Sequence, residues 1–390
     1  MKSKVMVPVV LAGAVAAAAT FATAVVAPTP GVVAGGFCTY RTGYFKTSTV
    51  AAQRINQYFG AAPGAEIFHV GTSPNAYTWQ KTGTLVSVGK GNKTVQVDFG
   101  VAALQQAVGT GGHPGAFSES ATNPTDMGTG GILAAQALAL KVNQGFSEVF
   151  VTPATGFSGL SFVNMDGVLL DGAELTPAQA NALNGQATLQ VREATDAALG
   201  LGTLPYGLSF AQLTDLIDLL NGSFDSCGQP SDFAQAHLYQ PYVTSNAYAG
   251  KRPSTVSTFA SKPTYNTFSG EVIPVLPDPD GRRLGCTSTS YVNFPAGDIA
   301  LIERGVCTFY QKVSVAIAAG ASAAIIFNNT PTPTTSCPAQ PTPGSSNCEA
   351  LVGMGAAAGS ATLPIPAAFV QRSTGLLLRD SAAPTAFVQQ

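Results

Sequence analysis

The feature of this sequence that most limits its fold is a strand, helix, strand pattern in residues 298–329. "DIALIER" and "ASAAIIFNN" are apolar runs of the strand type, and between them "TFYQKVSVAIAAG" spaces its apolar residues as a helix does. Thr308 and Gln311 stand where a capping box would begin this helix, and Gly320 suits the left-handed turn that ends it. Two strands joined by a helix indicate a βαβ-like unit.

The first residues have the pattern of a secretory signal. Two lysines within 1–4 precede an apolar, Ala-rich stretch at 5–21, and "ATA" at 22–24 has the small residues at which a signal peptidase cuts. We therefore expect a signal peptide over 1–24 and a secreted product, extracellular or at the cell surface, with no stable membrane insertion after cleavage. The alternative is an uncleaved anchor, because an apolar run of about 20 residues can span a bilayer.

Composition excludes several classes of partner. Only 10% of the residues are charged, the net charge is -2, and no block is rich in Lys and Arg. The chain therefore offers no basic surface for nucleic acid or anionic lipid. Hydrophobic residues make up 45% of the chain, which is enough for packed cores, and the length predicts two or three domains.

The cysteines favour disulfide bonds, because an even number of them in an exported chain is typical of a disulfide framework. Sequence alone does not choose among the possible pairings, but their order along the chain suggests three pairs, Cys38 with Cys227, Cys286 with Cys307, and Cys337 with Cys348.

Cys307 has a second interpretation as a nucleophile. It precedes the helix predicted to begin at Thr308, and Arg304 and Lys312 lie near it in the sequence. A helix N-terminus and nearby cations lower a thiol's pKa and make it reactive.

The N-terminal half mixes strand and helix patterns. Residues 78–100 alternate apolar and polar side chains on both sides of a Gly-Asn turn, which predicts a β-hairpin. Residues 109–131 have no periodicity and predict a long loop. Apolar residues at helical spacing predict helices near 132–144 and 187–199.

Two more helices are marked by their first residues. "TPAQANALN" places Thr176 at the N-cap and Gln179 at the capping-box position, and "SFAQLTDLIDLLNGSFD" does the same with Ser209 and Gln212. In a capping box each side chain satisfies a free backbone amide of the other residue, so both pairs predict a helix start.

The C-terminal third closely resembles the protease-associated (PA) domain family. The resemblance covers about 266–390, and its motifs are "FPAGDIALIERGVCTFYQKVSVAIAAGASAAIIFNN" (294–329) followed by "LPIPAAFVQRSTGLLLRD" (363–380). It implies a compact β-rich domain with a few helices and no catalytic residues, which serves as a protein-interaction or substrate-access module. It also implies a disulfide between Cys286 and Cys307.

Two features lie outside this resemblance. The Pro-rich insertion at 330–362 replaces a shorter loop in many members, so partner choice does not transfer from the family. In the N-terminal half, segments 130–146 and 208–227 are similar, more weakly, to helical segments of exported bacterial surface proteins.

Known hydrolase motifs are incomplete in this sequence. "GTSPNA" at 71–76 has no Asp or His partner motif, and Ser158 in "GFSGLSF" is not part of a full GxSxG elbow. HExxH is absent, and His69, His113 and His237 have no carboxylate at ligand-like spacing. We therefore expect no catalytic, cofactor-binding or metal-ligating residues and no cofactor.

Two smaller signals remain. "DPDG" at 278–281 could lend oxygen ligands to calcium, but it is more typical of a turn. Asn92, Asn221 and Asn328 each begin an N-x-Ser/Thr sequon and are candidate glycosylation sites in a eukaryotic secretory pathway.

Together these patterns predict an α+β protein. After the leader we expect an N-terminal domain over 37–227 with a β-hairpin and helices, a linker over 228–265 that can include one or two strands of its own, and the PA domain over 266–390. Our first interpretation is a secreted protein that is not an enzyme and whose PA domain binds a protein or peptide ligand through the loop between Cys337 and Cys348. The alternatives are a secreted hydrolase with an unrecognised site in the N-terminal domain, and a cell-surface adhesin or structural protein.

Overall fold

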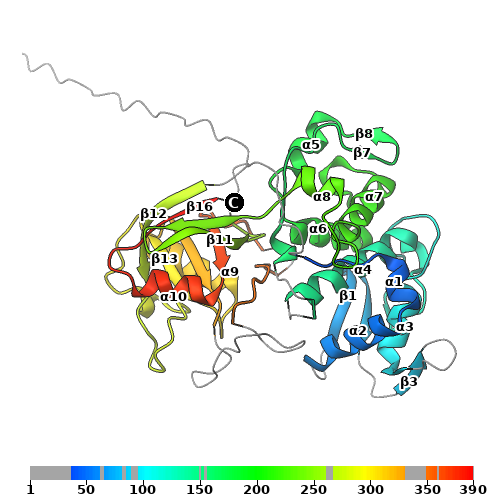
Figure 1. Ribbon diagram of the computed structural model, residues 1–390, viewed down its shortest axis with the longest axis horizontal. Helices are drawn as coiled ribbons and strands as arrows, with labels where there is room; N and C mark the ends of the chain where they lie inside the picture. The colour runs from blue at the N-terminus through cyan, green and yellow to red at the C-terminus, as the bar shows by residue number, and fades with distance from the viewer. Residues whose placement is uncertain are drawn as a thin grey trace, which may run out of the picture.

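The computed structural model has a helical N-terminal part and a C-terminal β-barrel (Figure 1). This combination confirms the α+β prediction. The structure describes residues 37–61, 66–80, 85–88, 95–148, 151–152, 156–260, 267–329, 348–357 and 360–389. The predicted signal peptide, Asn92 and Cys337 lie outside these ranges.

The N-terminal part consists of helices, short strands and 3₁₀ turns. Its helices are α1 (Thr42–Thr47), α2 (Thr49–Ala61), α3 (Phe99–Ala107), α4 (Gly131–Glu148), α5 (Pro177–Leu183), α6 (Thr188–Leu201), α7 (Phe210–Asn221) and α8 (Asp232–His237). Its strands are β1 (Glu66–Thr72), β2 (Asn75–Gln80), β3 (Leu85–Val88), β4 (Val95–Asp98), β5 (Ala121–Thr122), β6 (Ser161–Phe162), β7 (Leu169–Leu170), β8 (Ala173–Glu174) and β9 (Leu238–Tyr239). The 3₁₀ turns are η1 (Gly128–Gly130), η2 (Phe157–Gly159) and η3 (Pro205–Gly207).

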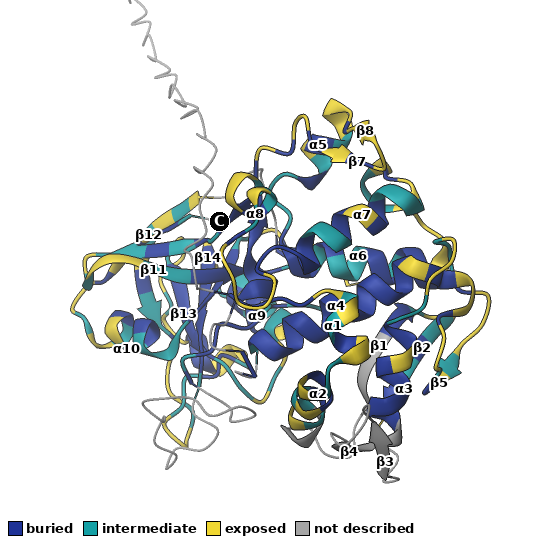
Figure 2. Ribbon diagram, turned by 45° about the vertical axis from the view of Figure 1, so that its right-hand side comes forward, coloured by how far each residue is buried: buried dark blue, intermediate teal, exposed yellow. Residues whose placement is uncertain are grey.

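Helix α4 is the centre of this part. It is buried along almost its whole length and packs against α1, α2, α6, α7 and strand β1, as the dark blue ribbon in Figure 2 shows. A helix that is buried on every side has no solvent-facing stripe for its polar residues. Lys141, Asn143 and Gln144 of α4 are therefore buried, and each forms side-chain hydrogen bonds inside the domain.

The predicted hairpin and helix caps are present. Strands β3 and β4 pair antiparallel, with Val86 opposite Val97. Thr176 and Gln179 form a reciprocal capping box at the start of α5, and Ser209 and Gln212 form one at the start of α7.

The C-terminal part is a closed seven-stranded barrel. Its strands are β10 (Tyr242–Ser245), β11 (Tyr248–Val256), β12 (Thr267–Pro274), β13 (Ile299–Glu303), β14 (Ala323–Phe327), β15 (Ala367–Val370) and β16 (Thr385–Gln389), in the spatial order β10, β11, β15, β14, β13, β12, β16. Its helices are α9 (Phe309–Ala318) and α10 (Arg372–Asp380), with a 3₁₀ turn η4 (Ser288–Tyr291).

The predicted strand, helix, strand unit lies in this barrel. Strands β13 and β14 are parallel neighbours joined through α9. Ala300 and Ile302 face a core that includes residues of α9, whereas Ile299 and Leu301 face a second core that includes Leu378 of α10. Both faces of the strand are buried, which explains its continuous apolar run.

The capping box predicted for α9 is only half formed. The Thr308 hydroxyl accepts a hydrogen bond from the Gln311 amide at 3.1 Å, but the Gln311 side chain donates to the carbonyl of Cys286 at 3.3 Å. Gln311 thus links the helix start to the disulfide-bonded segment.

The segment expected to be a linker over 228–265, with one or two strands of its own, contributes strands to the barrel. It contains α8, β9 and two barrel strands, β10 and β11. These barrel strands pair with each other and with β16 and β15, which come more than a hundred residues later in the sequence. Local sequence patterns do not reveal such distant pairing.

Two candidate glycosylation sites are incompatible with the folded structure. Asn221 is fully buried, and its side-chain nitrogen donates to the carbonyl of Gln136 at 3.0 Å. Asn328 is 1% exposed and donates to the carbonyl of Ala350 at 2.9 Å. A glycan on either nitrogen would replace a buried hydrogen bond and would have no path to solvent.

Two general properties bear on where the chain operates. Disulfides join Cys38 to Cys227 and Cys286 to Cys307, and such bonds persist in oxidising compartments. Cys348 is also disulfide-bonded. Within the described ranges, no helix is both long and apolar enough to cross a membrane.

Close packing of α6 on β1 makes a direct prediction. A Cβ on Gly200 would overlap the backbone of Thr72, whereas Gly43 in α1 has open space around it. Gly200→Ala should lower the free energy of unfolding by at least about 1–3 kcal/mol, because backbone must move. Gly43→Ala should raise it by up to about 1 kcal/mol, because alanine favours the helix. Equal effects in urea unfolding would contradict this packing.

Candidate functional site at the domain interface

The two parts of the molecule meet along the end of the PA-region insertion. The Thr255 hydroxyl of β11 donates to the carbonyl of Val352 at 2.7 Å, and the Thr258 amide donates to the carbonyl of Met354 at 2.9 Å. These bonds hold residues 351–355 beside the end of strand β11. The other side of the same segment contacts the N-terminal part.

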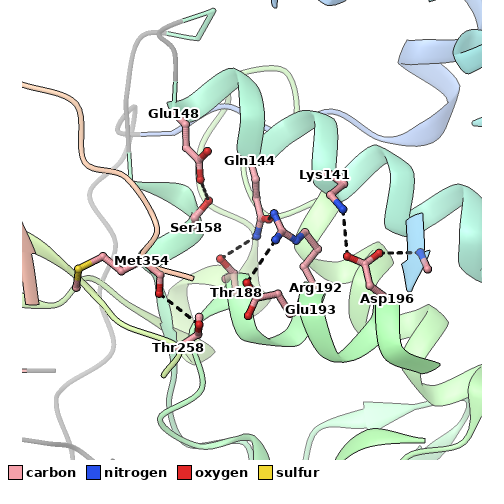
Figure 3. A network of polar contacts seen from close by, with 11 residues as sticks. Lys141, Gln144, Glu148, Ser158, Thr188, Arg192, Glu193, Asp196, Thr258 and Met354 are labelled. Carbon is pink, nitrogen blue, oxygen red and sulfur yellow. Dashed lines mark hydrogen bonds and ion pairs between the residues drawn. The ribbon is translucent and has the colours of Figure 1, made fainter. Parts of the chain in front are cut away.

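The contact with the N-terminal part is close. A Cβ on Gly353 would lie 2.6 Å from the side chain of Leu189 in α6 and 3.2 Å from the Cβ of Ser158. A Cβ on Gly355 would lie 2.9 Å from Oε1 of Glu193. Glycine at both positions therefore lets the insertion approach a group of polar side chains (Figure 3).

The first members of this group are Glu148 and Ser158. Glu148 is at the end of α4, and its Oε1 accepts a hydrogen bond from the Ser158 hydroxyl at 2.8 Å. Ser158 has no exposed surface. Its hydroxyl is therefore a buried structural donor and cannot reach a substrate.

Helix α6 supplies the members that remain open to solvent. The Glu193 side chain is 36% exposed and lies 3.6 Å from Arg192, measured from Oε1 to Nη2. Arg192 also donates to the side chain of Gln144 at 3.3 Å, and its Nε has no hydrogen-bond partner among the described residues. A carboxylate and a guanidinium thus lie together on α6, beside the insertion.

Burial raises the pKa of Glu193 above the usual value for a glutamate. The Arg192 guanidinium and a hydrogen bond with Thr258 favour the ionised form and partly oppose this effect. A carboxyl group whose pKa is shifted by burial beside a specific charge partner is a candidate functional group.

A buried ion pair joins α6, the helix that carries Arg192 and Glu193, to α4. Nζ of Lys141 lies 3.1 Å from Oδ2 of Asp196, and both side chains are about one tenth exposed, at 10% and 9%. Oδ1 of Asp196 accepts from the amide of Gly71 at 3.1 Å. Burial lowers the pKa of Lys141, and the Asp196 charge opposes this change. The pair joins α4, α6 and β1 and leaves no free group for chemistry.

The residues singled out in the sequence lie elsewhere. His113 is exposed, and Nδ1 of His237 lies 2.9 Å from the carbonyl of Asn164. His69 lies in β1. The described part of the chain contains no group of three or more His, Cys, Asp or Glu side chains arranged to hold a metal ion.

The two candidate turns are turns in the structure. Residues 71–76 comprise the end of β1, the turn and the start of β2. At 278–281 the Gly281 amide donates to the carbonyl of Asp278 at 2.8 Å. Both segments therefore have a structural role that needs no catalytic or calcium-binding function.

The nucleophile interpretation of Cys307 is wrong, because this residue is bonded to Cys286. Lys312, which suggested thiol activation in the sequence, is fully buried and donates to the carbonyl of Leu284. Its Nζ lies 3.8 Å from the sulfur of Cys286. This lysine therefore packs beside the disulfide. Burial lowers the pKa of Lys312 to about 8.

Sequence patterns do not predict Glu148, Arg192 or Glu193 as site residues. They occupy ordinary helical positions, and no motif surrounds them. Only the packing of the insertion against α6 brings them together, so the sequence carries no local signal for this site.

The raised pKa of Glu193 predicts a pH-dependent effect of Glu193→Gln on stability. The folded state holds the carboxyl proton more tightly than the unfolded state, so the wild-type chain loses stability as the pH rises through the folded pKa. Glutamine does not titrate. The melting temperature of Glu193→Gln minus that of the wild type should therefore increase by about 1–2 °C between acidic and neutral pH. The change is small because solvent screens the group.

The control for this measurement is Glu174→Gln, which removes an exposed carboxylate of β8. Thermal melts of this variant should follow the wild type across the same pH range. A Glu193→Gln difference that stays constant with pH would contradict the raised pKa of this carboxyl.

Comparison with known proteins places the barrel in a family. The sequence model of the PA domain matches residues 268–378. An aminopeptidase of Pseudomonas aeruginosa is 43% identical over 74 residues, which are 18% of this chain and 14% of the relative. Leucine aminopeptidase 2 of Arthroderma otae is 32% identical over 110 residues, 28% of this chain and 20% of the relative.

Structural comparison gives only weak overall likeness. A zinc aminopeptidase from Bacillus subtilis superposes with a TM-score of 0.27 and 18% identity, covering 38% of this chain and 30% of that chain. A score at this level supports no argument about fold or activity.

These relatives correct one expectation from the sequence. The sequence predicts a chain that is not an enzyme, whereas the curated relatives that it matches are named aminopeptidases. The chain spans at most about a fifth of their length, at 14% and 20%. What these findings do establish is that the C-terminal part of this chain, at residues 268–378, is a PA domain.

Proposed function

We propose that this chain is a secreted, peptidase-like hydrolase whose PA domain governs substrate access to a site at Glu193. The disulfides and the leader pattern support secretion. The PA domain and its similarity to segments of aminopeptidases support a peptide substrate.

One observation carries the proposal. The PA-region insertion packs close to a carboxylate whose pKa burial raises, with Gly355 beside Oε1 of Glu193. The insertion forms one wall of this site and α6 forms the other.

The chemistry follows from the two groups on α6. Ionised Glu193 takes a proton from a water molecule as that water attacks the carbonyl carbon of a peptide bond. The Arg192 guanidinium stabilises the negative charge that develops on the carbonyl oxygen. Glu193 then returns the proton to the amine that leaves when the C–N bond breaks. A raised pKa suits this role, because a more basic carboxylate accepts the proton more readily.

Hydrolysis of a panel of aminoacyl-p-nitroanilides and unblocked peptides tests the proposal. The chain from residue 25 onward, with its disulfides verified, should release product, and Glu193→Gln should lower kcat by about 100-fold or more with KM nearly unchanged. Arg192→Met should also lower kcat, because it removes the charge at the oxyanion.

Glu174→Gln is the matched control and should retain wild-type kcat. The absence of hydrolysis across the panel by the correctly disulfide-bonded chain would overturn the proposal, and so would full activity of Glu193→Gln.

A further inference from the structure

A groove lies between α10 and the β10–β11 hairpin of the barrel, and its lining includes no residue of the Glu193 group. Its cavity volume is about 450 Å³. The helix contributes positions spaced three or four residues apart, which share one face. The lining residues are Ser373, Leu376, Leu377, Asp380 and Ser381 from the helix and its end, and Ala247 and Arg252 from the β10–β11 hairpin.

Arg252 is the unusual residue in this groove. Its guanidinium lies over the ring of Tyr248, 4.8 Å from the centroid, and its Nε is buried without a hydrogen-bond partner among the described residues. A guanidinium has five N–H donors in a planar fork that fits a carboxylate.

Strand pairing sets the direction of the groove. Ser254 pairs with Val370, just before α10, so Arg252 lies toward the N-terminal end of the helix. At the other end, the side chain of Asn246 donates to the carbonyl of Ala383, which places the hairpin turn beside the end of α10. Arg252 and Asp380 therefore lie at opposite ends.

Asp380 gives the second end a carboxylate. It accepts from Arg379 at 2.6 and 2.9 Å, and this pairing keeps it ionised. A carboxylate has about four acceptor positions, so it can also accept from an ammonium group. The C-terminal carbonyls of α10 favour a cation at the same end.

The middle of the groove is apolar and its length is limited. Leu376 and Leu377 lie between the two charged ends, and Leu377 is 39% exposed. From Ser373 to Asp380 the helix rises about 10 Å, at 1.5 Å per residue. An extended peptide of about three residues has the same length.

We propose that this groove binds short peptides with free termini. The C-terminal carboxylate bonds to Arg252, the α-ammonium group bonds to Asp380, and an apolar side chain covers Leu376 and Leu377. The site uses no residue of the Glu193 group, so it does not depend on the proposed hydrolysis.

Calorimetric titration of the chain from residue 25 onward, carrying Glu193→Gln so that the proposed hydrolysis does not consume the peptide, with Ala-Leu-Ala tests this proposal. C-terminal amidation of the peptide should weaken binding at least tenfold, and N-acetylation should weaken it severalfold. Arg252→Met should weaken the free peptide at least tenfold and should make amidation nearly without effect, because both changes remove the same contact. Asp380→Asn should do the same for N-acetylation.

A control variant tests whether peptide binding belongs to this groove. Lys251→Met removes the neighbouring charge, which lies over the ring of Tyr242, and should leave binding unchanged. Because binding is measured in a chain without the proposed catalytic carboxylate, the two proposals fail independently. Equal affinity for the free and amidated peptides, or no heat at millimolar peptide, would overturn the assignment, and neither result depends on a variant of the groove folding.

Discussion

The contact that the rest of this structure depends on is the hydrogen bond from the buried Thr255 hydroxyl to the carbonyl of Val352. It fixes the end of the insertion to strand β11 of the barrel. The hydrogen bond from the Thr258 amide to the carbonyl of Met354 adds a second attachment. From that position Gly353 and Gly355 approach α6 without a side chain in the way. The PA domain thereby packs against the helix that carries Glu193.

The N-terminal part gives the site a rigid base because its central helix is buried. Polar residues on α4 have no solvent to bond with and instead bond across the domain. Asn143 donates to the side chain of Asn221 at 3.0 Å, and Lys141 pairs with Asp196. A buried charge that loses its partner is costly, so such networks hold neighbouring helices in one arrangement. Glu193 lies on the helix held in this way, one turn before Asp196.

Local patterns predict the elements of this protein well and their assembly poorly. Capping boxes locate α5 and α7, and apolar spacing locates α4, α6 and the β13–α9–β14 unit, because these signals lie within a few residues of the element. The sequence predicts a linker where β10 and β11 form, because their partners β15 and β16 lie far along the chain. The sequons at Asn221 and Asn328 carry no information about burial. The Glu193 site has no sequence signal because it exists only where two distant segments pack together.

Hydrogen–deuterium exchange on the intact chain tests the central claim, that the insertion is a structural part of this interface. The account predicts that the Thr258 amide, which donates to the carbonyl of Met354, exchanges slowly, with protection similar to that of residues 189–196 in α6. Exchange of the Thr258 amide within seconds, while α6 remains protected, would show that the insertion is not held at this interface and would contradict the account.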